Sequence, residues 1–287
     1  MKFSFEALGT TWWIELFEDL ENANLDEVKN FVEVFVSAYE KNYSRFLDDS
    51  QISVLNRERT FKNPSLEFVQ LLEYGKRLYL RSDTHFNLLT GHILESKGYN
   101  ADYTFTDSGS AETAGNPITD LSITSELIEL KHGNIDLGGY GKGYLIDLIA
   151  TEFRQTLHIE QFIINGGGDI YATHSAGEPI TIFLEHPTQT GTGIAKTTLI
   201  NQGFAASSPH KRVWKNETGE HTHIISDQLT SDATFIKAKT ASDADAFATT
   251  ALQLNQTDLE KLAKSEQLGI ALFDISSGRL VASQSFG

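Results

Sequence analysis

The chain has 287 residues, of which 40% are hydrophobic, so it can bury a large core as one domain of two lobes or as two small domains. Its formal net charge of −16 disfavours nucleic acids and anionic membrane surfaces as partners, because both require a stripe of basic residues. The absence of cysteine excludes disulfides, thiolate metal sites and cysteine nucleophiles.

The sequence contains no signal for membrane insertion. No apolar run approaches the roughly 20 residues that span a bilayer, and the first residues alternate like a strand instead of forming the apolar segment of a leader peptide. We therefore expect a cytoplasmic protein, although an exported form with a removed leader would look the same. The sequence does not predict the oligomeric state.

The N-terminal part of the chain begins with periodic segments. Residues 3–17 alternate as a pair of strands or one long strand, and residues 25–43 place apolar side chains on one helical face. Ser65 is a candidate N-cap of a second amphipathic helix that ends near residues 81–83. Residues 100–125 are polar and weakly periodic, so we predict a long surface excursion there, with a possible lobe boundary.

From residue 127 onward, predicted strands and helices are interspersed. The strands are predicted at 127–137, 161–164, 180–184, 196–206, 221–226, 233–237, 269–273 and 279–283. The helices are predicted at 142–157, from Ser242 as the N-cap to 254, and at 258–265. This order indicates the α+β class, with mixed β-sheets.

A glycine-rich turn between residues 136 and 147 joins a predicted strand to a predicted helix. Its four glycines, at 138, 139, 141 and 143, indicate that another group approaches the backbone closely. Lys142 lies at the start of the helix, where the dipole is already positive, so an anion such as phosphate would explain its position. The spacing fits neither a P-loop nor a dinucleotide-binding pattern. A tight turn with a solvated lysine is the alternative.

A second glycine run follows the predicted strand at 161–164. Asn165 and Asp169 bracket its three glycines. Ligands commonly bind at strand ends, so an amide and a carboxylate at this place favour a binding site. An ordinary mobile turn is the alternative.

The predicted helix after Ser242 carries a candidate metal site. Asp245 and Thr249 are four residues apart and share one helical face. A carboxylate and a hydroxyl are hard oxygen donors, which suit Mg²⁺ or Ca²⁺. Alternatively, Asp243 and Asp245 only complement the positive end of the helix dipole.

A pair of histidines is a candidate for proton transfer. His221 and His223 alternate onto one side of a predicted strand, among apolar neighbours. Histidine is the default general base near neutral pH. The alternative is that both are ordinary surface or core residues, as most of the nine histidines must be.

Together, these segments resemble the ApbE family of flavin transferases, which are FAD:protein FMN transferases. The similarity covers most of the chain and rests on the number and order of the motifs. Near the N-terminus, Leu8-Gly9-Thr10 matches the family's Met-Gly-Thr, Ser44-Arg45-Phe46 matches Ser-x-Tyr, and Ser50–Asn56 matches Ser-x-Ile-x-x-Leu-Asn. Further along, Asp136–Gly143 matches Asp-Leu-Gly-Gly-x-Ala-Lys-Gly and Asn165–Ile170 matches Asn-x-Gly-Gly-Asp-Ile. Ala244–Ala251 matches Ala-Asp-Ala-x-Ala-Thr-Ala.

The resemblance implies an ApbE-like fold with two lobes around a flavin cleft, formed by a single domain over 1–287. It also implies FAD as the substrate, with Mg²⁺ or another divalent cation at the pyrophosphate. FMN would be moved to a Thr or Ser hydroxyl of a target flavoprotein, with release of AMP.

Carried onto this sequence, the family's motifs imply roles for particular residues. The metal ligands would be Asp245, Thr249 and the main-chain carbonyl of Gly141, and His223 would be the general base. The residues that bind the flavin and the phosphates would be Phe46, Gly138, Lys142, Asn165, Gly167, Asp169 and Ser208.

Three segments depart from the family's pattern. Phe86–Gly91 replaces Phe-Asp-Pro-Thr-x-Gly, Ala206–Pro209 stands where Thr-Ser-Gly is expected, and Ser226 is inserted before Asp227 of the His-Ile-Ile-Asp-Pro motif. These changes affect the flavin and acceptor sides, whereas the metal and phosphate motifs are kept. Two alternatives to transfer therefore stay open: a flavin-binding protein without transferase activity, and a metal-dependent FAD pyrophosphatase that gives FMN and AMP.

Overall fold

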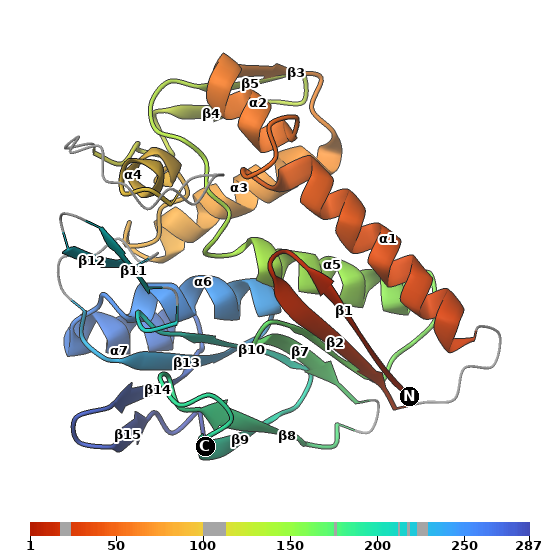
Figure 1. Ribbon diagram of the computed structural model, residues 1–287, viewed down its shortest axis with the longest axis vertical. Coiled ribbons are helices and arrows are strands. Elements are labelled where there is room, and N and C mark those ends of the chain that lie inside the picture. Colours follow the sequence, from red (N-terminus) through yellow and green to blue (C-terminus); the bar gives the residue numbers. More distant parts are fainter. Residues whose placement is uncertain (18–23, 100–112, 175–176, 212, 217–218, 223–228) are drawn as a thin grey trace. The chain divides into compact units, whose positions relative to one another are not determined.

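A computed structural model describes residues 1–17, 24–99, 113–174, 177–211, 213–216, 219–222 and 229–287. The chain divides into two compact units. Figure 1 shows the chain coloured along its sequence. Unit 1 comprises Met1–Glu40, Tyr140–Lys211 and Gln228–Gly287, and unit 2 comprises Lys41–Gly139 and Arg212–Asp227. The single domain with a possible lobe boundary near residues 100–125 stays a prediction.

Unit 1 is built on an eight-stranded sheet in the order β1-β2-β6-β7-β10-β13-β14-β15. Its strands are β1 (Lys2–Ala7), β2 (Thr10–Leu16), β6 (Phe162–Gly166), β7 (Asp169–Thr173), β10 (Gln202–Ser207), β13 (Ala233–Ala238), β14 (Gly269–Asp274) and β15 (Arg279–Ala282). Every neighbouring pair in this sheet is antiparallel, where mixed sheets were expected. The central strands β6 and β13 are buried along their whole length, because both faces of the sheet are covered.

Helices cover one face of this sheet and a β-hairpin covers the other (Figure 1). The covering elements are α5 (Gly141–Gln155), α6 (Ala241–Ala251), β8 (Ile180–Glu185) and β9 (Gly193–Leu199). Helix α5 packs against β6 and β7, and α6 packs against β10 and β13. The hairpin buries its apolar side chains in a cluster with Ile170 and Phe204. Because side chains alternate along a strand, β7 turns Asp169 toward the helices and Ile170 toward the hairpin.

Unit 2 combines short helices with small sheets. Its elements are α2 (Gln51–Glu58), α3 (Leu66–Arg81), α4 (Gly91–Ser96), a three-stranded sheet of β3 (Thr60–Lys62), β5 (Leu127–Leu130) and β4 (Leu121–Ile123), and a pair of β11 (Val213–Asn216) with β12 (Gly219–Thr222). Two further helices, α1 (Leu25–Tyr43) and α7 (Gln256–Ser265), complete the described elements. None of the helices in the described ranges has the length and hydropathy needed to cross a membrane.

Helix caps explain several boundaries. The hydroxyl of Ser65 accepts a hydrogen bond from the backbone N–H of Phe68 at 3.1 Å, which confirms the predicted start of α3. The predicted N-cap of α6 was wrong by two residues. Thr240 is the cap, because its hydroxyl accepts from the N–H of Asp243, whereas the hydroxyl of Ser242 donates to a carboxylate on α5.

Two strand predictions and one loop prediction need correction. The single strand at 196–206 is two strands, β9 and β10, separated by a tight turn in which Asn201 has a φ of 51°. The strand at 127–137 ends at Leu130, and β4 lies within the segment that was expected to be a surface excursion. Residues 100–112 of that segment lie outside the described residues.

Gly203 provides a test of how closely α6 lies on the sheet. A Cβ added at Gly203 would overlap the backbone of Thr240 and Ala241 at the start of α6. We expect Gly203→Ala to lower the free energy of unfolding by about 1–3 kcal/mol, the usual cost of overpacking, as measured by urea denaturation. Gly193→Ala on β9 is the matched control, because a Cβ there meets nothing within 4 Å. Equal stability of the two variants would contradict the close packing.

Candidate functional site

Lys142, in the first turn of α5, lies between two buried carboxylates of unit 1. Its Nζ atom is 2.5 Å from Oδ2 of Asp169 and 3.6 Å from Oδ2 of Asp245. The side chains of these three residues are 19%, 7% and 8% exposed. Buried charges require partners, so the lysine that was expected to face an anion already neutralises protein carboxylates. With both aspartates ionised, the cluster has one net negative charge.

Gly143 allows α5 and α6 to cross at close range. A Cβ added at Gly143 would meet Ser242 Cα at 2.7 Å and would overlap the carbonyl of Ala241. The backbone N–H of Gly143 donates to Oδ2 of Asp245 at 3.1 Å. The N-terminus of α5 therefore orients the carboxylate of Asp245, the residue that was predicted as a metal ligand.

Asp147 on α5 holds the start of α6 through hydrogen bonds. Its carboxylate accepts hydrogen bonds from the backbone N–H groups of Ala241 and Ser242, both at 2.9 Å, and from the hydroxyl of Ser242 at 2.5 Å. Burial raises the pKa of Asp147 to about 6, although the hydrogen bonds from Ser242 and Ala241 oppose this rise. No sequence pattern singled out this residue, because its partners lie 94 and 95 residues further along the chain.

The proposed metal ligands supply oxygen atoms around the same place. Thr249 lies one turn after Asp245 on α6, and its Oγ1 is 3.3 Å from Oγ of Ser207 at the end of β10. The carbonyl of Gly141 accepts a hydrogen bond from the hydroxyl of Tyr39 at 3.0 Å. Within the described ranges, no group of three His, Asp or Glu side chains suits a metal ion. A carboxylate, a hydroxyl and a carbonyl nevertheless fit a hard cation that takes its other ligands from phosphate or water.

The second glycine run forms the tight connection between β6 and β7. The side-chain oxygen of Asn165 accepts from the backbone N–H of Gly168 at 2.8 Å, which closes the turn. Gly167 and Gly168 have φ values of 75° and 107°, which other residues rarely adopt. Asp169 opens β7 and pairs with Lys142. The two polar residues that bracket this run therefore face opposite sides of the sheet.

A cavity of about 130 Å³ opens on the hairpin face of the sheet. It is lined by Asn165, Gly168, Ile170, Phe183, Glu185, Pro187, Phe204, Ala206, Ser207, Ser208, Lys211, Ala233 and Phe235. The lining is mostly apolar, with a few polar groups that point to the same space. Ser207 belongs both to this cavity and to the Thr249 contact, so the end of β10 joins the two faces.

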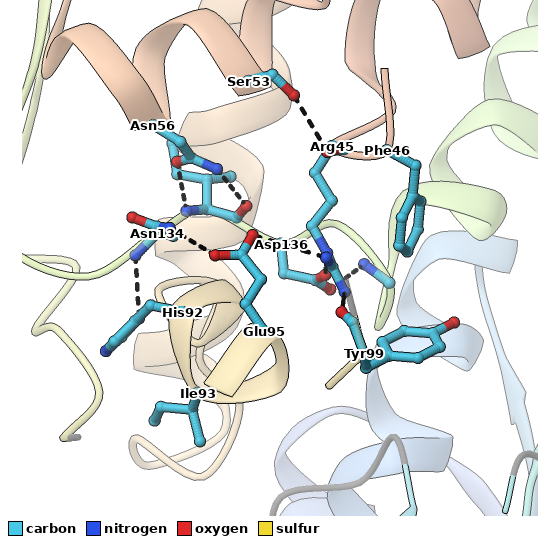
Figure 2. A network of polar contacts seen from close by, with 12 residues as sticks. Arg45, Phe46, Ser53, Asn56, His92, Ile93, Glu95, Tyr99, Asn134 and Asp136 are labelled. Carbon is cyan, nitrogen blue, oxygen red and sulfur yellow. Dashed lines mark hydrogen bonds and ion pairs between the residues drawn. The ribbon is translucent and has the colours of Figure 1, made fainter. Parts of the chain in front are cut away.

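In unit 2, the first residue of the glycine-rich turn is part of a buried ion pair (Figure 2). The guanidinium of Arg45 pairs with one oxygen of Asp136, and the other oxygen accepts from the backbone N–H of Gly138 at 2.6 Å. The side chain of Arg45 is only 3% exposed, and it also donates to the carbonyl of Tyr99 at 3.0 Å. The carboxylate of Asp136 therefore shapes the turn.

The first two glycines of the turn are explained by contacts within unit 2. A Cβ at Gly138 would lie 2.7 Å from the Asp136 carboxylate, and one at Gly139 would lie 3.1 Å from the ring of Phe86. The groups that approach the backbone at these two positions belong to the protein itself. Phe46 is in the same unit, with the guanidinium of Arg45 4.2 Å from the centre of its ring.

The structure brings most of the predicted site residues together in unit 1. These are Gly141, Lys142, Asp169, Asp245 and Thr249 on the helix face, with Asn165, Gly167 and Ser208 at the strand ends. Phe46 and Gly138 belong to unit 2. His223 lies outside the described residues. No sequence pattern singled out Asp147, and Ser207 entered the sequence predictions only as part of the Ala206–Pro209 segment beside the predicted Ser208.

Comparison with known structures agrees with this fold. The structure is similar to the ApbE protein from Thermotoga maritima, with a TM-score of 0.83 and 17% identity over 99% of this chain and 97% of that one. It is also similar to the flavin transferase ApbE from Vibrio cholerae, with a TM-score of 0.78 and 17% identity over 100% of this chain and 97% of that one. At such low identity, these similarities define the α+β fold of an ApbE protein.

The sequence comparisons assign the family. A FAD:protein FMN transferase from Rhodobacter capsulatus is 27% identical over 165 residues, which are 54% of this chain. The match spans 31% of the length of that protein, less than a third. The model of the ApbE family matches residues 8–273, and the chain belongs to this family.

Asp147 predicts a pH dependence of stability. Its pKa is raised from 3.8 to about 6 by burial, so its contribution to stability is present below pH 3.8 and is lost as the pH rises through about 6. We compare the unfolding free energies of the unchanged protein and of Asp147→Asn at each pH. We expect the value for the unchanged protein minus the value for the variant to fall by up to about 3 kcal/mol between pH 4 and pH 8. Urea denaturation at a series of pH values measures this difference. A difference that does not change with pH would contradict the raised pKa.

Proposed function

We propose that the protein is a Mg²⁺-dependent FAD:protein FMN transferase. It would move FMN from FAD to a Thr or Ser hydroxyl of a target flavoprotein and release AMP. One observation carries the proposal: Lys142 and Asp245, which come from two family motifs about 100 residues apart, meet where α5 crosses α6, and Thr249 lies one turn after Asp245 on α6.

In this proposal, the helix face of unit 1 binds the pyrophosphate. The first turn of α5 offers backbone N–H groups and a positive dipole, which attract phosphate oxygens. Lys142 adds a full positive charge at the same end of the helix. A divalent cation held by Asp245, Thr249 and the carbonyl of Gly141 would neutralise the negative charge that develops on the pyrophosphate.

The remaining predicted residues would position the flavin. Asn165, Gly167 and Ser208 lie at or beside the cavity on the hairpin face, whose apolar floor suits a planar ring system. The hydroxyl of Ser208 donates to the carbonyl of Asp232 at 2.8 Å and accepts from the N–H of His210 at 3.1 Å, so its orientation is fixed. Phe46 and Gly138 stay predictions from the family's motifs.

The chemical step requires a base for the acceptor hydroxyl. The acceptor oxygen forms a bond to the phosphorus of the FMN half, the bond from that phosphorus to the AMP oxygen breaks, and AMP departs with the electron pair. His223 would take the proton of the acceptor hydroxyl, because it matches the histidine of the family's His-Ile-Ile-Asp-Pro motif.

The reaction is tested by incubating the chain with FAD, Mg²⁺ and a flavoprotein domain that carries a candidate acceptor. AMP together with an increase in acceptor mass equal to one FMN supports transfer. AMP with free FMN instead indicates a pyrophosphatase, in which water replaces the acceptor. Retained FAD binding without AMP indicates a flavin-binding protein that does not react.

Asp245→Ala tests the cation site. The variant loses one hard ligand and one negative charge, so we expect metal-dependent AMP release to be abolished. Asp243→Ala removes a carboxylate two residues earlier on the same helix and serves as the matched control, with activity retained. Turnover in Asp245→Ala equal to that of the control would refute the site.

His223→Ala tests the proposed base. General-base catalysis contributes about 10²–10⁴-fold, so we expect AMP release in the presence of acceptor to slow by that factor while FAD affinity is unchanged. His221→Ala, the neighbouring histidine in the sequence, is the control. A loss of less than tenfold would assign His223 a role other than proton transfer.

A further inference from the structure

The ammonium of Lys142 is shared unequally between two carboxylates. Its Nζ atom is 2.5 Å from Oδ2 of Asp169, a contact ion pair, but 3.6 Å from Oδ2 of Asp245. Asp169 is the first residue of β7, where it is paired with Gly166 of β6, and the next residue, Ile170, is paired on both sides, with β6 and with β10. The lysine therefore lies closer to the carboxylate that belongs to the sheet.

Asp245 has a second source of stabilisation. The oxygen that faces Lys142 also accepts the backbone N–H of Gly143 at 3.1 Å. This N–H belongs to the start of α5, where unpaired donors and the helix dipole favour a negative charge. The Asp245 carboxylate is thus stabilised without a close ion pair, which leaves it able to accept a cation.

Removing the charge of Asp169 would change this balance. Lys142 would then have one buried carboxylate instead of two within reach, and the attraction between opposite charges grows steeply as they approach in a low-dielectric environment. The lysine would close on Asp245 and form a contact ion pair. That pair would compete with any divalent cation for the same carboxylate oxygens.

We propose that Asp169 is a positioning residue that holds Lys142 away from Asp245 and so keeps the Asp245 carboxylate available to a divalent cation. The inference rests on the proposed function, because Asp245 is the cation ligand of that function. It gives Asp169 a task different from lining the flavin pocket, the role that the family's motif implies.

Binding of Mn²⁺ to the full chain without flavin tests the inference, with free Mn²⁺ counted by electron paramagnetic resonance. We expect Asp169→Asn to weaken Mn²⁺ binding by about 10–100-fold, the usual effect of altering a residue that orients a metal ligand. Asp243→Asn loses the same charge two residues from Asp245, and we expect less than a threefold change in this control.

The double variant Asp169→Asn/Lys142→Met removes the competing lysine as well. We expect its Mn²⁺ affinity to return to within about threefold of the unchanged protein, while its FAD affinity stays reduced because the lysine is missing. Restored cation binding with impaired FAD binding separates positioning from a general loss of structure, and circular dichroism checks that each variant is folded.

The inference is overturned if Asp169→Asn binds Mn²⁺ as the unchanged protein does, if Asp243→Asn is weakened equally, or if the double variant is not restored. Failure of the unchanged protein to bind Mn²⁺ would instead refute the proposed cation site, and the inference with it. AMP release by the unchanged protein, measured in parallel, distinguishes these two outcomes.

Discussion

The close crossing of α5 and α6 is the constraint on which the rest of the site depends. These helices come from segments about 100 residues apart, and three contacts join them: the packing at Gly143, the bond from its N–H to Asp245, and the hydrogen bonds that Asp147 accepts at the start of α6. Helix α6 also lies against the backbone of β10 at Gly203. The carboxylate, the lysine and the strand ends are thereby held at fixed distances before any ligand arrives, which is the preorganisation that charge stabilisation requires.

The charge distribution explains why a cation is part of the proposed chemistry. A protein with a formal net charge of −16 repels a pyrophosphate unless positive charge is concentrated locally. The positive charge of Arg45 is neutralised by its buried ion pair with Asp136. The charge of Lys211 is likewise paired, with Glu185 at 2.6 Å. At the crossing of the helices, positive potential comes from the α5 dipole and from Lys142, which already pairs with the carboxylates of Asp169 and Asp245. In the proposed function, a divalent cation would supply the positive charge that this arrangement lacks.

The sequence predicted well those features that leave a local signal. The amphipathic helix at 25–43 and the cap at Ser65 were found because periodicity and capping act within a few residues. The break between β9 and β10 was missed because the turn at Ile200 and Asn201 contains neither glycine nor proline.

Contacts between distant segments left no such signal. The glycine-rich turn was singled out, but the sequence could not show that Asp136 pairs with Arg45, 91 residues away, or that Phe86 occupies the space beside Gly139. The spacing of Asp245 and Thr249 placed both on α6, whereas the orientation of Asp245 comes from the N–H of Gly143. Local patterns therefore selected candidate residues, and tertiary packing determined which of them face one another.

Ser207 gives the site a property that neither face has alone. Ser207 is among the residues that line the cavity on the hairpin face, and its hydroxyl lies 3.3 Å from that of Thr249 on the helix face. With the cavity and the proposed cation site both occupied, a shift at this contact would let each occupant act on the other. Such coupling is reciprocal, so each occupant would change the affinity of the other by the same factor. The end of β10 would then link the two faces of the sheet thermodynamically.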